Sequence, residues 1–139
     1  MGEKKDWFGV KTFYVSETSG RVENRDRFYK KESVMLEERV VIFKAKNFDA
    51  AIKLAESEAK KYAKCKHINP YRETVTCKYI DIYDAFKLYD DPTLPGAEVF
   101  SATELHMKKG DAVKAAKSRF GPSYRGKLEQ RLRLKFRHW

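Results

Sequence analysis

The segment from Phe48 to Ala63 constrains the fold most strongly, because its apolar residues recur at helical spacing. Asn47 stands directly before it, where a helix N-cap belongs, and Asp49 in the first turn complements the helix dipole. These signals predict one amphipathic helix whose apolar side is narrow and rich in alanine, so that it can lie close against a sheet. The residues of that side are Phe48, Ala51, Ile52, Ala55, Ala59 and Tyr62.

Segments with the character of strands flank this helix. Residues 7–15 and 34–45 precede it, and residues 74 to about 89 and 97 to about 105 follow it. The short links between consecutive elements favour antiparallel pairing. We therefore expect an α+β fold in the order β-β-α-β-β, with an antiparallel sheet of about four strands and the main helix on one face.

Net charge divides the chain into two parts. Residues 1–104 hold 19 lysines and arginines against 18 acidic residues, whereas residues 105–139 hold 11 against 2. The net charge of +10 therefore belongs almost entirely to the C-terminal segment. Because single domains usually have about 100–150 residues, we expect an α+β domain over residues 1–105 and a basic extension over residues 106–139.

The sequence of the basic extension predicts two short elements, a helix and a strand. Asp111 can cap a short helix. Further on, Arg131–Arg137 alternates strictly, which would place Leu132, Leu134 and Phe136 on one face of a strand and cations on the other. That strand would bury its apolar side and present a positive ridge.

Hydropathy and cysteine content exclude several classes of protein. No apolar run approaches the roughly 18 residues needed to cross a bilayer, and no apolar stretch near the start is long enough for a signal peptide. Cys65 and Cys77 are too few for a disulfide framework and fit a reducing compartment. The sequence therefore predicts a cytoplasmic protein that makes no membrane contact.

One group of residues approaches a metal-binding pattern. Cys65-Lys-His67 could combine with Cys77, and His106 would have to complete the set from another strand. Zinc sites usually take their ligands in pairs of the Cys-x₂₋₄-Cys kind, and this spacing is absent. The sequence therefore favours structural roles for these residues, and we expect neither a metal nor a cofactor.

Acidic residues on the predicted strands are the remaining catalytic candidates. Glu37 and Arg39 share a face of a strand, where a cross-strand ion-pair network would account for them. Asp81 and Asp84 fall on opposite faces of a regular strand, which does not suit two carboxylates sharing a proton. An enzyme using the Glu37/Arg39 region is the weakest interpretation, and we expect no catalytic residue.

Binding is better supported, because aromatic residues stand among the cations of the extension. Cations attract phosphates in a salt-dependent manner, and aromatic rings stack on unpaired bases. The leading hypothesis is a small non-enzymatic protein that contacts the nucleic-acid backbone. Alternatively, the aromatic residues dock the extension onto the domain. The candidate nucleic-acid-binding residues are Arg119, Tyr124, Arg125, Lys127, Arg131, Arg133, Lys135, Arg137 and Trp139.

Three blocks within roughly residues 7–104 resemble the opening strand, the central strand with its helix, and the closing hairpin of a known family. The blocks are Trp7–Lys11, Glu37–Ala45 with Phe48–Ile52 and Ala55–Glu56, and Ile80–Asp84 with Glu98–Ser101. In these blocks the chain resembles the bacterial domain-of-unknown-function family 4288, and the basic extension lies outside the match. The resemblance implies the fold and a bacterial or phage origin, since the family has no established activity.

The resemblance also supplies an alternative function. Some small bacterial domains of this kind accompany toxins as immunity proteins. The alternative hypothesis is therefore a protein that binds a toxin or another enzyme and inhibits it, through the sheet or through the acidic hairpin around Asp90. The sequence leaves the oligomeric state open.

Overall fold

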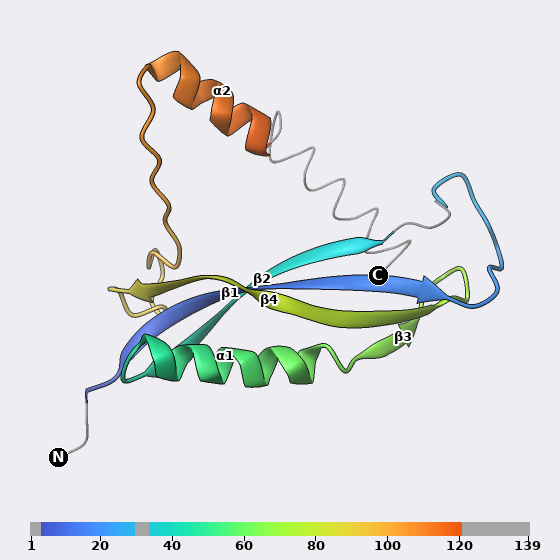
Figure 1. Ribbon diagram of the computed structural model, residues 1–139. Coiled ribbons are helices and arrows are strands. Elements are labelled where there is room, and N and C mark those ends of the chain that lie inside the picture. Colours follow the sequence, from blue (N-terminus) through green and yellow to red (C-terminus); the bar gives the residue numbers. More distant parts are fainter. Residues whose placement is uncertain (1–3, 30–33, 121–139) are drawn as a thin grey trace.

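A computed structural model describes residues 4–29 and 34–120 of the chain. Its elements are β1 (Asp6–Ser19), β2 (Met35–Ala45), α1 (Phe48–Tyr62), β3 (Lys66–Ile68), β4 (Thr74–Leu88) and α2 (Lys109–Phe120). The four strands form one antiparallel sheet in the order β2-β1-β4-β3 (Figure 1). The expected α+β class, strand number and β-β-α-β-β order are confirmed, but one of the two strands after α1 is not the one expected.

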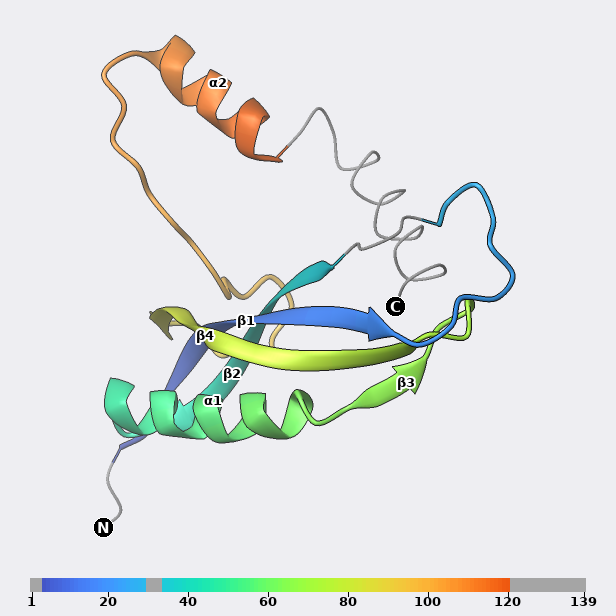
Figure 2. The same ribbon diagram turned by 45° about the vertical axis from the view of Figure 1, so that its right-hand side comes forward.

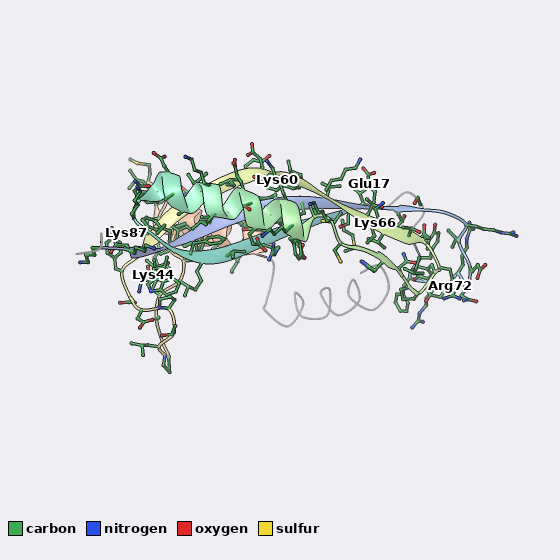
Figure 3. The ribbon with its side chains drawn as sticks, turned by 90° about the horizontal axis from the view of Figure 1, so that it is seen from below. Glu17, Lys44, Lys60, Lys66, Arg72 and Lys87 are labelled. Atoms are coloured by element: carbon green, nitrogen blue, oxygen red, sulfur yellow. The ribbon has the colours of Figure 1, made fainter. Side chains whose placement is uncertain are left out.

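The helix α1 covers one face of the sheet, as its apolar pattern predicts. The Asn47 side chain caps it by accepting a hydrogen bond from the backbone N–H of Ala50 at 2.8 Å. Three alanines, Ala51, Ala55 and Ala59, are buried against the strands. Because alanine is small, the helix axis lies close to the sheet, and Figure 3 shows α1 extended along the strands.

The core lies between α1 and the even-numbered residues of β1. Phe8 and Val10 are buried with Ala45 and with the alanines of the helix. In the antiparallel register, Phe8 faces Phe43 and Val10 faces Val41 on β2. Because facing residues share a side of the sheet, the odd-numbered residues of β2 point toward α1, and its even-numbered residues point away from it.

The prediction of a strand over residues 97–105 is wrong, since that segment has no regular secondary structure. The fourth strand is instead β3, which comes directly before β4 and pairs with it. A turn held by Asn69 joins the two strands, because the Asn69 side-chain oxygen accepts hydrogen bonds from the backbone N–H groups of Tyr71 and Glu73, each at 3.0 Å. The three exposed residues of β3 carry no apolar pattern that would identify a strand.

The helix α2 lies on the side of the sheet away from α1 (Figures 1 and 2) and contacts none of the other described elements. A short helix in the extension is confirmed, but it begins at Lys109, so Asp111 stands in its first turn and not at its cap. The strand expected over Arg131–Arg137 lies outside the described residues. Among the described residues, neither helix has the length and apolarity to span a bilayer.

Candidate functional site

The face of the sheet opposite α1, here called the open face, carries large apolar side chains in contact with solvent. Leu36 is 67% exposed and Tyr83 is 64% exposed, whereas Val40, Ile42 and Ile80 are each about two-fifths exposed. Leu36, Val40 and Ile42 are even-numbered residues of β2, so they share one side of that strand. Large apolar residues exposed together on one face typically mark an interaction site.

The open face is hollowed near its middle. The hollow has a volume of about 420 Å³. Two rings pack edge to face within it, with the centroids of Phe13 and Tyr83 4.8 Å apart. A charge pair crosses from β1 to β2 beside it, since the Lys11 ammonium lies 2.8 Å from the Glu38 carboxylate. The hollow is lined by Lys11, Phe13, Leu36, Ile80, Tyr83 and Asp84.

Irregular pairing between β1 and β4 brings these residues together. The register shifts between Lys11 and Thr12 and again between Phe13 and Tyr14. Such irregularities break the strict alternation of side chains, so Ile80 and Tyr83, three positions apart, line the same hollow. The expectation that Asp81 and Asp84 lie on opposite faces is therefore wrong. Asp81 faces Phe13 and Asp84 faces Lys11, and both of these odd-numbered β1 residues point away from α1.

Part of the open face is covered by the segment that follows β4. The Phe100 ring packs edge to face on Phe86, with centroids 5.2 Å apart, and the Lys11 ammonium lies 4.3 Å from the Phe100 ring centroid. Phe86 faces Gly9 across the β1–β4 pairing. The chain thus already uses the open face as a docking surface for one of its own aromatic residues.

On the opposite face, Arg39 links the sheet to α1. Its guanidinium donates two hydrogen bonds to the Glu58 carboxylate, at 3.0 and 3.2 Å, and a third to the Tyr14 hydroxyl at 3.0 Å. It also lies 3.6 Å from the Tyr62 ring centroid. Burial alone would lower the pKa of Arg39, but the hydrogen bonds to Glu58 and Tyr14 raise it overall.

Glu37 takes part in the same contact between helix and sheet. It accepts a hydrogen bond from the Tyr62 hydroxyl at 2.6 Å. Burial, and then this hydrogen bond, raise the pKa of Tyr62 well above the ordinary tyrosine value. The expected structural role of Glu37 and Arg39 holds, but their partners come from the helix and not from a neighbouring strand. These contacts fasten α1 to the sheet.

The residues nearest to a metal-binding pattern do meet in space. Cys65, His67 and Cys77 line one hollow of about 250 Å³ beyond the end of α1, together with Ser16 and Tyr62. Within residues 4–29 and 34–120, however, no group of three or more His, Cys, Asp or Glu side chains is placed to hold a metal ion. Burial raises the pKa of the Cys77 thiol, and its hydrogen bond to Ser16 opposes that rise. His106 lies elsewhere, 3.1 Å from Glu104.

The candidate nucleic-acid residues are described only in part. Arg119 lies at the end of α2 and forms an ion pair with Glu104. Hydrogen bonds from Arg119 and then His106 hold the pKa of Glu104 below its usual value. Arg119 is therefore already paired with a carboxylate of its own chain. The other eight candidates, from Tyr124 to Trp139, lie outside the described residues.

Sequence reasoning offered the sheet as one possible binding surface but identified none of the residues of the open face. The run Val40–Phe43 indicated an apolar surface beyond the core, because four consecutive apolar residues place apolar side chains on both faces of one strand. Only one of those sides is needed for the core under α1.

The acidic hairpin is a tight turn, in which Asp91 accepts hydrogen bonds from the backbone N–H and the hydroxyl of Thr93.

Comparison with known proteins gives a family but no function. No curated protein and no solved structure matches the chain. The family described as Domain of unknown function (DUF4288) matches residues 7–101, which include all of the sheet except Asp6, together with α1 and the docked Phe100. The chain therefore belongs to the DUF4288 family, with the basic extension outside the region that the family shares.

Proposed function

We propose that the chain is a non-enzymatic binding protein whose open face binds a protein partner. The observation that carries this proposal is the row of exposed apolar residues on β2 and β4 described above. Water contact with this much aliphatic and aromatic surface is unfavourable by about 25 cal/mol per Å². Covering it with a partner recovers that free energy. Aliphatic side chains predominate over aromatic ones, which favours a protein over stacked bases.

The position of β2 indicates how the partner binds. Among the described residues, β2 pairs only with β1, so its outer edge presents backbone N–H and C=O groups. An extended segment can add to such an edge by main-chain hydrogen bonds. Alternate side chains of that segment would then continue the apolar surface formed by Leu36, Val40 and Ile42. We therefore expect an extended segment with apolar residues at every second position.

The first prediction concerns contact at the open face. We expect p-benzoylphenylalanine at position 83, on activation by light in the producing cell, to form a covalent adduct with one partner protein. Adding Leu36→Lys to that chain should reduce the adduct at least about tenfold, because an unpaired charge in an apolar interface costs more than about 1.4 kcal/mol. The measurement is the yield of the adduct, with its composition determined by mass spectrometry.

A leucine on the other side of the molecule provides the matched control. Leu54 is 46% exposed on α1, so the Leu54→Lys substitution should leave the adduct yield unchanged. An adduct between two copies of the chain would identify the partner as a second copy. A crosslink only to residues 121–139 of the same chain would refute the proposal, because the extension itself would then cover the open face.

In an immunity-type role, the alternative weighed from the sequence, the partner is a toxin or another enzyme. Such a partner would lose its activity when it binds the open face. Addition of the purified chain, with Leu36→Lys as the comparison, would then inhibit the partner's activity in proportion to its occupancy.

A second candidate function is nucleic-acid binding by the basic extension, and the composition of α2 favours it. This helix carries four cations, Lys109, Lys114, Lys117 and Arg119, against Asp111. It contacts no other described element, so its exposed lysines are accessible to a polyanion. Cations spaced along a surface bind phosphates by releasing counterions. This proposal stands on charge and does not depend on the open face.

The second prediction separates the two functions by salt dependence. We expect the full chain to bind duplex DNA with a log–log salt slope of about −0.9 for each phosphate contacted. Neutralising Arg131, Arg133, Lys135 and Arg137 to Gln should make the slope shallower by about 0.9 for each phosphate that is no longer bound. Neutralising Lys53, Lys60 and Lys61 on α1 is the control and should leave the slope unchanged. Equal effects of the two sets would contradict a role for the extension.

A further inference from the structure

Two cysteines meet at the junction of α1, β3 and β4. In the pairing of β3 with β4, Lys66 faces Thr76 and His67 faces Val75. Continuing this register by one residue places Cys65 opposite Cys77. Both cysteines line the same hollow. The register and the hollow independently place the two thiols on one side of the ladder.

Facing positions of a regular antiparallel pair have the spacing that a disulfide needs. Directly opposed residues of an antiparallel pair have Cα atoms about 4.5–5.5 Å apart. Disulfides join residues whose Cα atoms lie about 4.4–6.8 Å apart and whose Cβ atoms point toward each other. Because Cys65 comes just before the three-residue edge strand β3, small adjustments of its backbone cost little.

The two thiols differ in access. Cys65 is exposed, whereas Cys77 is partly buried and hydrogen-bonded to Ser16. A dissolved oxidant therefore reaches Cys65 first. Cys77 then stands next to the mixed disulfide that forms, in the position of a resolving thiol. Burial disfavours the Cys77 thiolate, so proximity and not a lowered pKa drives the second step.

We propose that Cys65 and Cys77 form an oxidation site that closes to an intramolecular disulfide. A low-molecular-weight disulfide such as oxidised glutathione is the oxidant. The Cys65 thiolate attacks one of its sulfur atoms and releases one glutathione thiolate. The Cys77 thiolate then attacks the Cys65 sulfur and releases the second. The protein loses two protons and two electrons, and oxidised glutathione is reduced to two molecules of glutathione.

The bridge would fasten the end of α1 and the edge strand β3 to β4. It would close a loop from residue 65 to residue 77 and join two walls of the hollow. Restricting the unfolded chain by a loop of this length stabilises the folded state. The site requires neither the open face nor the basic extension, so this inference and the proposed function can fail separately. A cytoplasmic location would make the bridge transient and responsive to redox conditions.

The test is oxidation of the full chain in glutathione buffers of graded ratio. We expect a monomeric product with two hydrogens fewer in its mass and no free thiol. Its thermal midpoint should be about 10 °C above that of the reduced chain. Cys65→Ser and Cys77→Ser should each yield at most a mixed disulfide with glutathione. Circular dichroism confirms that each variant is folded.

A register control makes the result specific. The double variant C65S/K66C keeps two cysteines but moves one of them to the position opposite Thr76, where its side chain points to the other face. Its intramolecular bridge should form at least about tenfold more slowly. Oxidation of the unaltered chain to mixed disulfides or disulfide-linked dimers alone would overturn the proposal. Equal rates for the double variant and the unaltered chain would also overturn it.

Discussion

Replacing Arg39 with methionine is expected to lower the free energy of unfolding by about 2–3 kcal/mol. The substitution removes two charge-assisted hydrogen bonds to Glu58, one hydrogen bond to Tyr14 and the stacking on Tyr62. Methionine preserves the length of the side chain, so a change in packing contributes little. For a chain of this size the thermal midpoint should fall by about 10 °C. Thermal and urea unfolding followed by circular dichroism measure both quantities.

Two comparisons identify the source of this effect. Arg39→Lys should recover less than half of the lost stability. An ammonium lacks the planar fork of a guanidinium, so it cannot bind both Glu58 carboxylate oxygens and stack on the Tyr62 ring at the same time. Lys78→Met is the surface control, since Lys78 lies 4.0 Å from Glu17 and both side chains are mostly exposed. That variant should change stability by less than about 0.5 kcal/mol. Equal losses for Arg39→Met and Lys78→Met would contradict the role given to the buried contacts.

The helix α1 and the strand β2 could be predicted from sequence because their signals are local. The run before Asn47 predicts a strand over residues 34–45, and β2 spans Met35–Ala45. The spacing of apolar residues predicts a helix over residues 48–63, and α1 spans Phe48–Tyr62. In both cases the repeat of the side-chain pattern matches the geometry of the element. The tertiary contacts of α1 and β2 agree with the secondary structure that each local pattern favours.

The segment after β4 could not be predicted in this way. Val99 and Phe100 have the composition of a strand, yet Phe100 is used as a single ring docked on Phe86. The strand β3 has the opposite problem, since Lys66, His67 and Ile68 are all exposed. It pairs because the Asn69 turn brings it alongside β4. The docked ring depends on one contact outside its own segment, and β3 depends on one turn, so neither shows as a repeating pattern of apolar residues.

The residues of the open face could not be identified from the sequence for a related reason. Apolar residues on a strand predict burial, and the sequence does not say how many layers are available to bury them. One main helix can cover only one side of the sheet, so the even-numbered apolar residues of β2 remain exposed. The hollow also depends on the two register shifts between β1 and β4. Their positions follow from the pairing of the strands and not from either strand alone.

Gly9 provides the second large effect, because the ring of Phe86 occupies the space where a side chain would stand. A Cβ atom built on Gly9 would lie 2.6 Å from the Cζ atom of Phe86. A glycine inside a strand often marks such a close approach, with an aromatic ring covering the bare backbone. We expect Gly9→Val to lower the free energy of unfolding by about 2–3 kcal/mol, because the Phe86 ring must leave Gly9 and move away from the Phe100 ring.

The clash with Phe86 can be tested by removing the ring. In a Phe86→Ala background, Gly9→Val should be neutral or stabilise the chain by up to about 1 kcal/mol, since valine favours strands. The coupling between the two sites would then be about 3 kcal/mol. Gly110→Ala is the control, because a Cβ there meets nothing within 4 Å, and it should leave the unfolding midpoint unchanged. If Gly9→Val cost the same in both backgrounds, Phe86 would not be the obstacle.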